Sequence, residues 1–182
     1  MSRSLVNPEL TLFSYEVLAL VGRKGTGAHD LLRMAHRGRM LAWAGESQYY
    51  TEPKRLAGLG YLAARKEPGK TRERTVYALT DRGLQALVEY AGSPVTFTPV
   101  KSDALLRLLM CDLVGEEVTR ESLGSLRGEI AELQRALDDS ERSAHELPHR
   151  EKYLLLAIGF LRGLLELHLE LVDEVERDFA RP

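Results

Sequence analysis

Residues 60–80, GYLAARKEPGKTRERTVYALT, decide the fold of the first half of the chain. Two short segments in this stretch, 61–66 and 74–79, predict strands because apolar, aromatic and β-branched side chains gather in them between turn signals. Pro68 and Gly69 lie between these segments and form a turn signal, and the rest of the turn is largely charged. The stretch therefore predicts a two-stranded ribbon with a basic tip.

Helical patterns surround this ribbon on both sides. Apolar residues recur at helical spacing over 12–22, a second helix is expected from Gly27, and a third is expected over 47–59. Thr80 is a typical N-cap residue, so a fourth helix is expected to follow the second strand. The order helix, helix, helix, strand, basic loop, strand, helix is typical of a winged helix-turn-helix.

The residue types of the third helix and of the ribbon suit contact with duplex DNA. An α-helix fits a major groove ~12 Å wide, and a two-stranded wing can place cations along the adjacent phosphate backbone. We expect either Tyr49 or Tyr50 to face inward, and the polar side chains of the third helix to face outward. The predicted DNA contacts are Ser47, Gln48, Tyr50, Thr51, Lys54 and Arg55 on the helix, and Lys70, Arg72 and Arg74 on the wing.

The charge of the chain is distributed unevenly. Residues 1–92 hold 14 Lys and Arg against 9 Asp and Glu, a net +5, whereas residues 93–182 hold 11 against 18, a net −7. A basic half followed by an acidic half indicates that one part meets a polyanion while the other part has a different role.

Three short motifs follow one another through the first half, namely Tyr50-x-x-x-Lys54-Arg55-Leu56, Gly60-Tyr61-Leu62 and Arg74-x-x-Tyr77-x-Leu79-Thr80-x-x-Gly83. Together with the helical second half, they resemble the PadR family of bacterial transcriptional regulators. The resemblance implies a homodimeric repressor or activator that binds two operator half-sites and is sometimes controlled by a small effector. It also implies that Tyr50, Lys54 and Arg55 lie on the recognition helix, and that Lys70, Arg72 and Arg74 lie on the wing.

Two positions depart from the family pattern. Ala28 and His29 stand where the family usually has a Gly-Tyr pair, and Pro53 stands where an apolar helical residue is common. Proline lacks an amide donor and costs ~3 kcal/mol inside a helix. Either the recognition helix starts late, near Glu52, with residues 47–50 as an approach loop, or its first turn is kinked.

The chain is expected to change character near residue 93. Pro94 and Pro99, together with Ser and Thr residues, predict a linker over 93–101 between a DNA-binding domain, 1–92, and a helical dimerisation domain, 102–182.

The second half has helical patterns throughout. A helix over 103–114 is apolar all round, and a last helix is expected to start with Pro148 in its first turn and to end near Phe179. Between them lies a heptad seam, with apolar residues spaced 3, 4, 3 and 4 apart, at Leu123, Leu126, Ile130, Leu133 and Leu137. The fold class predicted for the whole chain is mainly α, with an N-terminal winged helix-turn-helix followed by a helical hairpin or coiled coil.

Residues 153–175 are so rich in leucine that one antiparallel helix cannot cover them. Arg162, Glu166 and Glu170 argue against a membrane span, because each charge at a bilayer centre costs ~2.5–3.5 kcal/mol. A second subunit is the favoured cover, and a large intrachain helical core is the alternative. The predicted dimer contacts are Leu126, Ile130, Leu133, Leu154, Ile158, Leu161, Leu165, Leu169 and Val172.

No residue constellation in the sequence points to catalysis, and no cofactor or metal site is expected. Cys111 lies in an apolar run and is expected to be a small core residue, and the five histidines show no metal-binding motif.

The N-terminus lacks an apolar signal segment, so a cytoplasmic location is expected. An effector cavity near Trp43 or near the linker remains open, and a packed aromatic residue is the simpler interpretation. The competing functional hypothesis is a helical homodimer whose winged domain is a protein-interaction module that does not read DNA.

Overall fold

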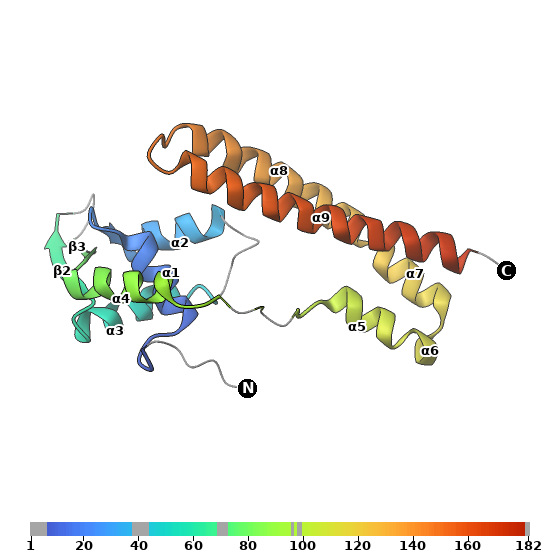
Figure 1. The fold of residues 1–182 in the computed structure, drawn as a ribbon, viewed down its shortest axis with the longest axis horizontal. Helices are drawn as coiled ribbons and strands as arrows, with labels where there is room; N and C mark the ends of the chain where they lie inside the picture. The colour runs from blue at the N-terminus through green and yellow to red at the C-terminus, as the bar shows by residue number, and fades with distance from the viewer. Residues whose placement is uncertain (1–6, 38–43, 69–72, 96, 98–99, 181–182) are drawn as a thin grey trace. The chain divides into compact units, whose positions relative to one another are not determined.

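The protein is described by a computed structural model that covers residues 7–37, 44–68, 73–95, 97 and 100–180. The chain divides into two compact units, Met1–Thr96 and Phe97–Pro182. In the described residues, helices predominate and three short strands form one small sheet (Figure 1). The predicted fold class, mainly α with a small β-wing, is therefore confirmed.

The first unit contains four helices and the three strands within its described residues. In chain order these are α1 (Leu12–Val21), β1 (Thr26–Gly27), α2 (Ala28–Arg37), α3 (Gln48–Gly58), β2 (Leu62–Glu67), β3 (Arg74–Leu79) and α4 (Asp81–Gly92). The sheet order is β1-β3-β2, and both pairings are antiparallel. The ribbon expected from the sequence is present with its strands shifted by at most one residue, and β1 is an additional strand that the sequence analysis did not predict.

Local signals explain where the helices of the first unit begin. The side chain of Thr11 accepts a hydrogen bond from the amide of Ser14, and the side chain of Ser14 accepts one from the amide of Thr11, so α1 starts with a capping box. The hydroxyl of Thr80 accepts from the amide of Gly83 at 3.1 Å, which confirms the predicted cap of α4. Gly83 has no room for a side chain, because a Cβ there would lie 2.3 Å from the carbonyl oxygen of Tyr61.

One apolar core joins α1, α2, α3, α4 and the sheet. Leu18, Leu31 and Leu56 are fully buried in it, and Tyr61 and Tyr77 are nearly so. Burial of a leucine side chain of this size contributes about 1.5–3 kcal/mol. This core holds α3 with one face inward and the other face toward solvent.

The second unit is entirely helical in its described residues. Its helices are α5 (Asp103–Leu109), α6 (Cys111–Val114), α7 (Glu116–Gly124), α8 (Leu126–His145) and α9 (Glu151–Phe179). Helices α8 and α9 lie side by side as an antiparallel hairpin (Figure 1). None of the described helices combines the length and apolar character needed to cross a bilayer.

Three expectations for this half are corrected. The helix expected over 103–114 is broken at Met110, which ends α5 with a backbone conformation outside the helical region. The heptad seam is divided at Ser125, so that Leu123 lies on α7 and the other seam residues lie on α8. Helix α9 begins at Glu151 rather than at Pro148, because the amides of Arg150 and Glu151 bond back to the carbonyl of Leu147 in a turn.

Two arginines bridge the two helices of the hairpin. The guanidinium of Arg127 on α8 lies 2.6 Å from carboxylate oxygens of both Asp173 and Glu176 on α9. The guanidinium of Arg162 on α9 lies 2.6 Å from carboxylate oxygens of Asp138 and Glu141 on α8. These bridges connect α8 and α9 at two places along the hairpin.

Candidate nucleic-acid interface

Helix α3 begins at Gln48, so the late start near Glu52 is wrong. Pro53 lies inside the helix with its ring buried, and Tyr49 and Leu56 are buried on the same side. Tyr49 is thus the inward-facing member of the Tyr49–Tyr50 pair. The N-terminal part of α3 is helical and belongs to the candidate surface.

The hydroxyl of Tyr49 donates a 3.0 Å hydrogen bond to a carboxylate oxygen of Glu16 on α1. Burial raises the pKa of Tyr49 to about 12, and burial also raises the pKa of Glu16 above its ordinary value. The other carboxylate oxygen of Glu16 is buried and has no hydrogen-bond partner among the described residues. This contact fixes the N-terminal half of α3 against α1.

The opposite face of α3 is exposed and polar. The predicted contacts on it that are exposed to solvent are Ser47, Gln48, Tyr50, Thr51 and Lys54. The hydroxyl of Thr51 donates to the backbone carbonyls of Ser47 and Gln48, so this side chain lies close to the helix backbone. Within the described part of the chain, the ammonium group of Lys54 has no hydrogen bond or ion pair. Lys54 is therefore the side chain of this face best placed to receive a phosphate or a base edge.

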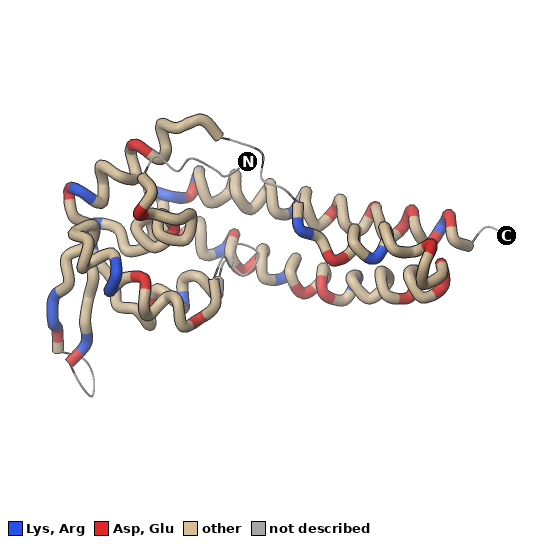
Figure 2. Tube along the Cα trace, turned by 90° about the horizontal axis from the view of Figure 1, so that it is seen from below, with Lys and Arg blue, Asp and Glu red and all other residues tan. Residues whose placement is uncertain are grey.

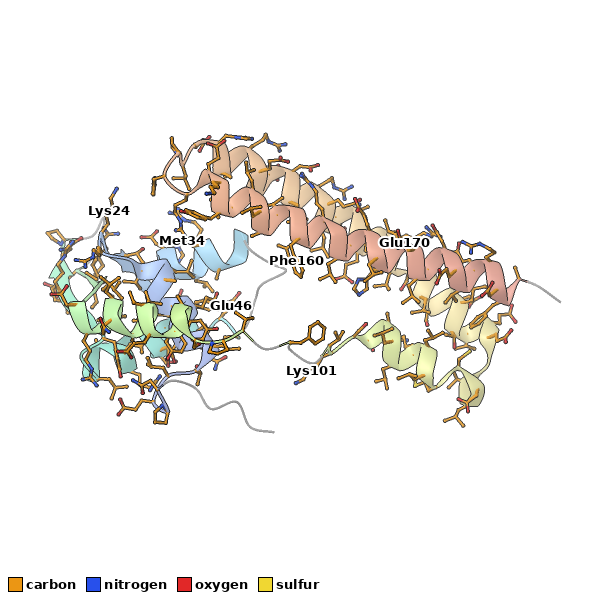
Figure 3. All side chains as sticks on the ribbon, in the orientation of Figure 1. Lys24, Met34, Glu46, Lys101, Phe160 and Glu170 are labelled. Carbon is orange, nitrogen blue, oxygen red and sulfur yellow. The ribbon has the colours of Figure 1, made fainter. Side chains whose placement is uncertain are left out.

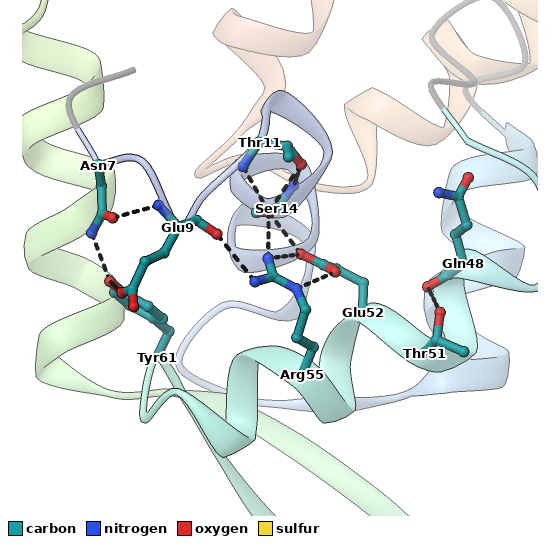
Figure 4. Close-up of polar contacts among 9 residues, drawn as sticks. All are labelled: Asn7, Glu9, Thr11, Ser14, Gln48, Thr51, Glu52, Arg55 and Tyr61. Atoms are coloured by element: carbon teal, nitrogen blue, oxygen red, sulfur yellow. Dashed lines mark hydrogen bonds and ion pairs between the residues drawn. The ribbon is translucent and has the colours of Figure 1, made fainter. Parts of the chain in front are cut away.

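Unlike its neighbour Lys54, Arg55 is surrounded by hydrogen-bond acceptors, and Figure 4 shows its contacts. Its guanidinium makes a two-pronged contact with Glu52, at 2.8 Å and 2.6 Å. It also donates to the hydroxyl of Ser14 at 3.0 Å and to the backbone carbonyl of Glu9 at 3.1 Å. The hydrogen bond to Arg55 lowers the pKa of Glu52, and the same bond raises the pKa of Arg55. The structure thus places Arg55 on α3, as expected, but its donors bond to Glu52 of the same helix, to Ser14 on α1 and to Glu9 before α1.

The wing carries acids among its cations. Lys70 and Arg72 lie outside the described residues, and Arg74 lies at the start of β3. The guanidinium of Arg74 lies 3.5 Å from Asp30 and 3.4 Å from Glu67. In Figure 2 a blue and a red stretch accordingly lie next to each other near the tip of each arm of the ribbon. Arg74 itself is exposed and its two acids are partly exposed, so such pairs contribute little and the cation can exchange a carboxylate for a phosphate at low cost.

A basic turn before β1 is a further candidate that the sequence analysis treated only as the end of a helix. Arg23 and Lys24 are exposed there, and Lys24 projects away from the first unit in Figure 3. The amide of Leu79 on β3 bonds to the carbonyl of Gly22 at 2.9 Å, so this turn lies at the base of the wing. The Arg-Lys pair between two glycines is the signal by which it could have been found.

The predicted dimer contacts fall into two groups in the second unit. Buried within the single chain are Ile130, Ile158, Leu161, Leu165 and Val172, and half-buried are Leu126, Leu133, Leu154 and Leu169. The first group is packed inside the hairpin and its surroundings, so it offers little surface to another subunit. This burial was not anticipated, because the sequence shows the leucines of α9 on all sides of the helix.

Other apolar side chains of α9 are exposed instead. They follow helical spacing along one face, at Tyr153, Leu156, Phe160, Leu164 and Leu167, and we call this set the α9 stripe. Phe160 is 73% exposed and extends from α9 away from α8 in Figure 3. An exposed apolar row of this length is typical of an interaction surface.

A cavity of about 500 Å³ lies within the second unit, beside the start of α5. Its walls include Lys101, Ser102 and Arg107 on one side, and Leu126 and His168 on the other. Trp43, the other residue considered for an effector site, lies outside the described residues. The described residues contain no group of three or more His, Cys, Asp or Glu side chains arranged to hold a metal ion.

Solved structures of similar fold include transcriptional regulators. PadR of Bacillus subtilis, solved with operator DNA and separately with p-coumaric acid, is 22% identical, with a TM-score of 0.68 over 93% of this chain and 98% of that chain. The Vibrio cholerae virulence activator AphA is 18% identical, with a TM-score of 0.71 over 92% and 97%. The PadR-like regulator BC1756 of Bacillus cereus is 16% identical, with a TM-score of 0.67 over 93% and 99%.

No protein-family model matches the chain, and no curated protein is significantly similar to it in sequence. At the identities of the solved structures, the similarity establishes the fold. The chain therefore has the winged-helix fold of PadR-type regulators along almost its whole length, and the resemblance seen in its motifs is confirmed at this level.

Proposed function

We propose that this protein is a DNA-binding transcriptional regulator of the PadR type. The observation that carries the proposal is the exposed polar face of α3, on which the ammonium group of Lys54 has no polar partner among the described residues, together with the charged wing. Support comes from the fold, which the chain shares with a PadR protein solved with operator DNA.

In the proposed mechanism, α3 enters the major groove and the wing lies along the phosphate backbone. Gln48, Thr51 and Lys54 carry groups that bond base edges or phosphates, so they are the proposed reading residues. Lys70, Arg72 and Arg74 are the proposed phosphate contacts, which position the protein without reading sequence. Each phosphate contact releases counterions, so the affinity for DNA should fall steeply with salt.

We further propose that two copies act together through the second unit. The α9 stripe gives a second copy an apolar surface that the hairpin of one chain leaves open. A twofold dimer presents two recognition helices to successive major grooves about 34–36 Å apart, so the operator is expected to be palindromic. Residues 1–92 and 102–182 are the proposed DNA-binding and dimerisation domains.

A small effector is proposed to act through the cavity beside α5. The wall of this cavity combines the cations Lys101 and Arg107 with apolar side chains such as Leu126, and it also contains Glu129 and Asp103, of which Asp103 pairs with Arg107 at 2.8 Å. B. subtilis PadR was solved with p-coumaric acid, which shows a small organic acid on a protein of this fold. Equilibrium dialysis with aromatic carboxylic acids, and with neutral analogues as controls, tests whether this cavity binds such molecules.

A second candidate function is a protein-interaction module on a helical dimer. The specific observation in its favour is the pairing of described wing cations with acids, which lowers the net charge of the wing, as in the Lys66–Glu73 and Arg65–Glu67 pairs. Such a module would show no salt-sensitive binding to duplex DNA and would tolerate charge reversal on the wing.

The proposed function is tested by selecting bound sequences from random duplex DNA with the purified full chain. The expected result is one enriched palindromic sequence, whose affinity falls linearly with salt on logarithmic axes. Alanine at Lys70 or Arg72 should weaken binding to selected and random duplexes alike. Failure to enrich any sequence, together with binding that does not depend on salt, would favour the interaction module.

A further inference from the structure

Arg55 and Lys54 are adjacent cations on α3, yet their surroundings differ completely. In the portion of the chain that the structure describes, Lys54 makes no polar contact, whereas Arg55 donates four hydrogen bonds. The acceptors are both carboxylate oxygens of Glu52, the hydroxyl of Ser14 and the backbone carbonyl of Glu9. Four of the five donor hydrogens of the guanidinium are therefore used inside the protein.

The partners of Arg55 are themselves fixed in place. Ser14 is fully buried and closes the capping box of α1 with Thr11. Its hydroxyl donates to Glu52 at 2.7 Å, so Glu52 accepts from α1 and from Arg55 at the same oxygen. The side chain of Glu52 is only 13% exposed. The Arg55–Glu52 pair thus closes a contact between α3 and the start of α1 (Figure 4).

Glu9 extends this contact to the segment before α1. Its backbone carbonyl accepts from Arg55, and its carboxylate accepts from the hydroxyl of Tyr61 at 3.2 Å. The same tyrosine hydroxyl accepts from the amide group of Asn7 at 2.6 Å, and Arg82 lies 4.4 Å from the centre of its ring. The segment around Glu9 is therefore fastened on one side to α3 and on the other to the residues around Tyr61.

We propose that Arg55 is a positioning residue of the DNA-reading helix: with Glu52 and Ser14 it sets the orientation of α3, while Lys54 beside it contacts DNA. This inference rests on the proposed function and refines it. Base-edge hydrogen bonds depend on angle and distance, whereas contacts with phosphates tolerate small rotations. Loss of the clamp formed by Arg55, Glu52 and Ser14 should therefore reduce sequence discrimination more than general affinity for DNA.

Glu52 provides the sharpest test, because electrostatics and positioning predict opposite results. Glu52→Ala removes a negative charge beside the proposed DNA-binding face and breaks two of the four hydrogen bonds of Arg55, so a DNA-contacting Arg55 would bind more tightly. If Arg55 is a positioning residue, Glu52→Ala lowers affinity for the selected duplex by about tenfold and for random duplex by less than about twofold. Arg55→Ala gives the same losses, and the double variant loses no more than either single variant.

The salt dependence of binding separates the two roles again. Removing a phosphate contact lowers the slope of log affinity against log salt by about 0.9, so Lys54→Ala should flatten the slope and Arg55→Ala should leave it unchanged. Arg55→Lys keeps the charge, but a single ammonium group cannot bond Glu52, Ser14 and Glu9 together as the planar guanidinium does. Its sequence discrimination should therefore be as low as that of Arg55→Ala. Ser14→Ala is expected to reduce discrimination in the same direction.

Each variant is compared with the wild type by circular dichroism and thermal unfolding, and Arg55→Lys and Ser14→Ala remain informative if Arg55→Ala does not fold. Higher affinity of Glu52→Ala for all duplexes, or a flatter salt slope for Arg55→Ala, overturns the positioning role. Those results leave the proposed function intact, whereas a wild-type protein that neither selects a sequence nor responds to salt refutes the proposed function and this inference together.

Discussion

The two units of this chain treat their apolar side chains in opposite ways. The first unit gathers them in one core, where Leu18, Leu31 and Leu56 have no exposed surface. The second unit buries one face of α9 against its neighbours and leaves Leu156 and Phe160 of the α9 stripe 69% and 73% exposed. One unit is thus complete as a single chain, whereas the other retains a surface suited to a second copy.

Their arginines differ in a parallel way. In the first unit, Arg55 and Arg74 lie on elements expected to meet DNA but are held by acids of the same unit. In the second unit, Arg127 and Arg162 join the two helices of the hairpin. An exposed arginine on a recognition element therefore need not contact DNA, because acceptors within the protein can already occupy its donors.

The largest expected effect is on assembly through the α9 stripe. Phe160→Glu should weaken a dimer by more than about a thousandfold, over ~4 kcal/mol, because it places an unpaired charge in an apolar contact of both copies. Sedimentation equilibrium at micromolar concentration measures the change. Glu166→Lys, on an exposed part of α9 outside the stripe, is the matched control and should leave assembly unchanged. Equal masses for the Phe160 variant and the wild type would show that the α9 stripe is not a dimer contact.

Ile158 lies two residues before Phe160 but is buried inside the hairpin, so its substitution should affect the stability of the single chain rather than assembly. Ile158 is 6% exposed, so Ile158→Ala should lower the free energy of unfolding by ~3 kcal/mol. Because the loss lies within one chain, it should be the same at every protein concentration in denaturant titrations. The effect of Phe160→Glu should instead grow with protein concentration. A concentration-dependent loss in the Ile158 variant would return Ile158 to the subunit interface predicted from the sequence.

The elements with strong local signals were predicted well. The Pro-Gly turn between two short runs located β2 and β3, and Thr80 located the start of α4, because each signal acts within a few residues. Helix α9 was placed by its apolar period, but its start was three residues off because Pro148 suits a turn as well as a first helical turn. Strand β1 has two residues, too few to show any period.

The role of Arg55 depends on distant parts of the chain. Its acceptors Ser14 and Glu9 lie 41 and 46 residues away, so no local pattern reveals them. The same holds for Ile158 and Phe160, which are both apolar residues of one helix and differ only in what packs against them. Sequence reasoning therefore identified the right helices and residue types, and tertiary contacts decide which side chains face outward.

A smaller effect is expected at the proposed reading surface. Lys54→Ala should weaken binding to duplex DNA about fivefold, ~1 kcal/mol, because one cation facing the DNA is lost. Competition titrations at several salt concentrations measure the affinity and its slope. Lys152→Ala removes an exposed cation of the second unit and serves as the matched control. Equal losses in both variants would indicate a general effect of charge rather than a surface on α3.

The smallest effect is expected inside the first unit, at the contact between α1 and α3. Burial raises the pKa of Glu16 above its ordinary value of 4.5, so the native state disfavours the charged form. The folded state therefore bears the cost of burying the charged carboxylate. Glu16→Gln keeps an acceptor for the hydroxyl of Tyr49 and should raise the free energy of unfolding by less than ~1 kcal/mol.

This gain should shrink as the pH falls through the raised pKa of Glu16 toward 4.5, because the native wild-type protein then takes up a proton before the unfolded chain does. Thermal unfolding of both proteins between neutral and mildly acidic pH measures the difference. Glu89→Gln, at an exposed position on α4, is the control for a loss of one negative charge. A Glu16 variant that is less stable than the wild type at neutral pH would show that the charged carboxylate, through its hydrogen bond with Tyr49, stabilises α3 against α1 in addition to the Arg55–Glu52 pair.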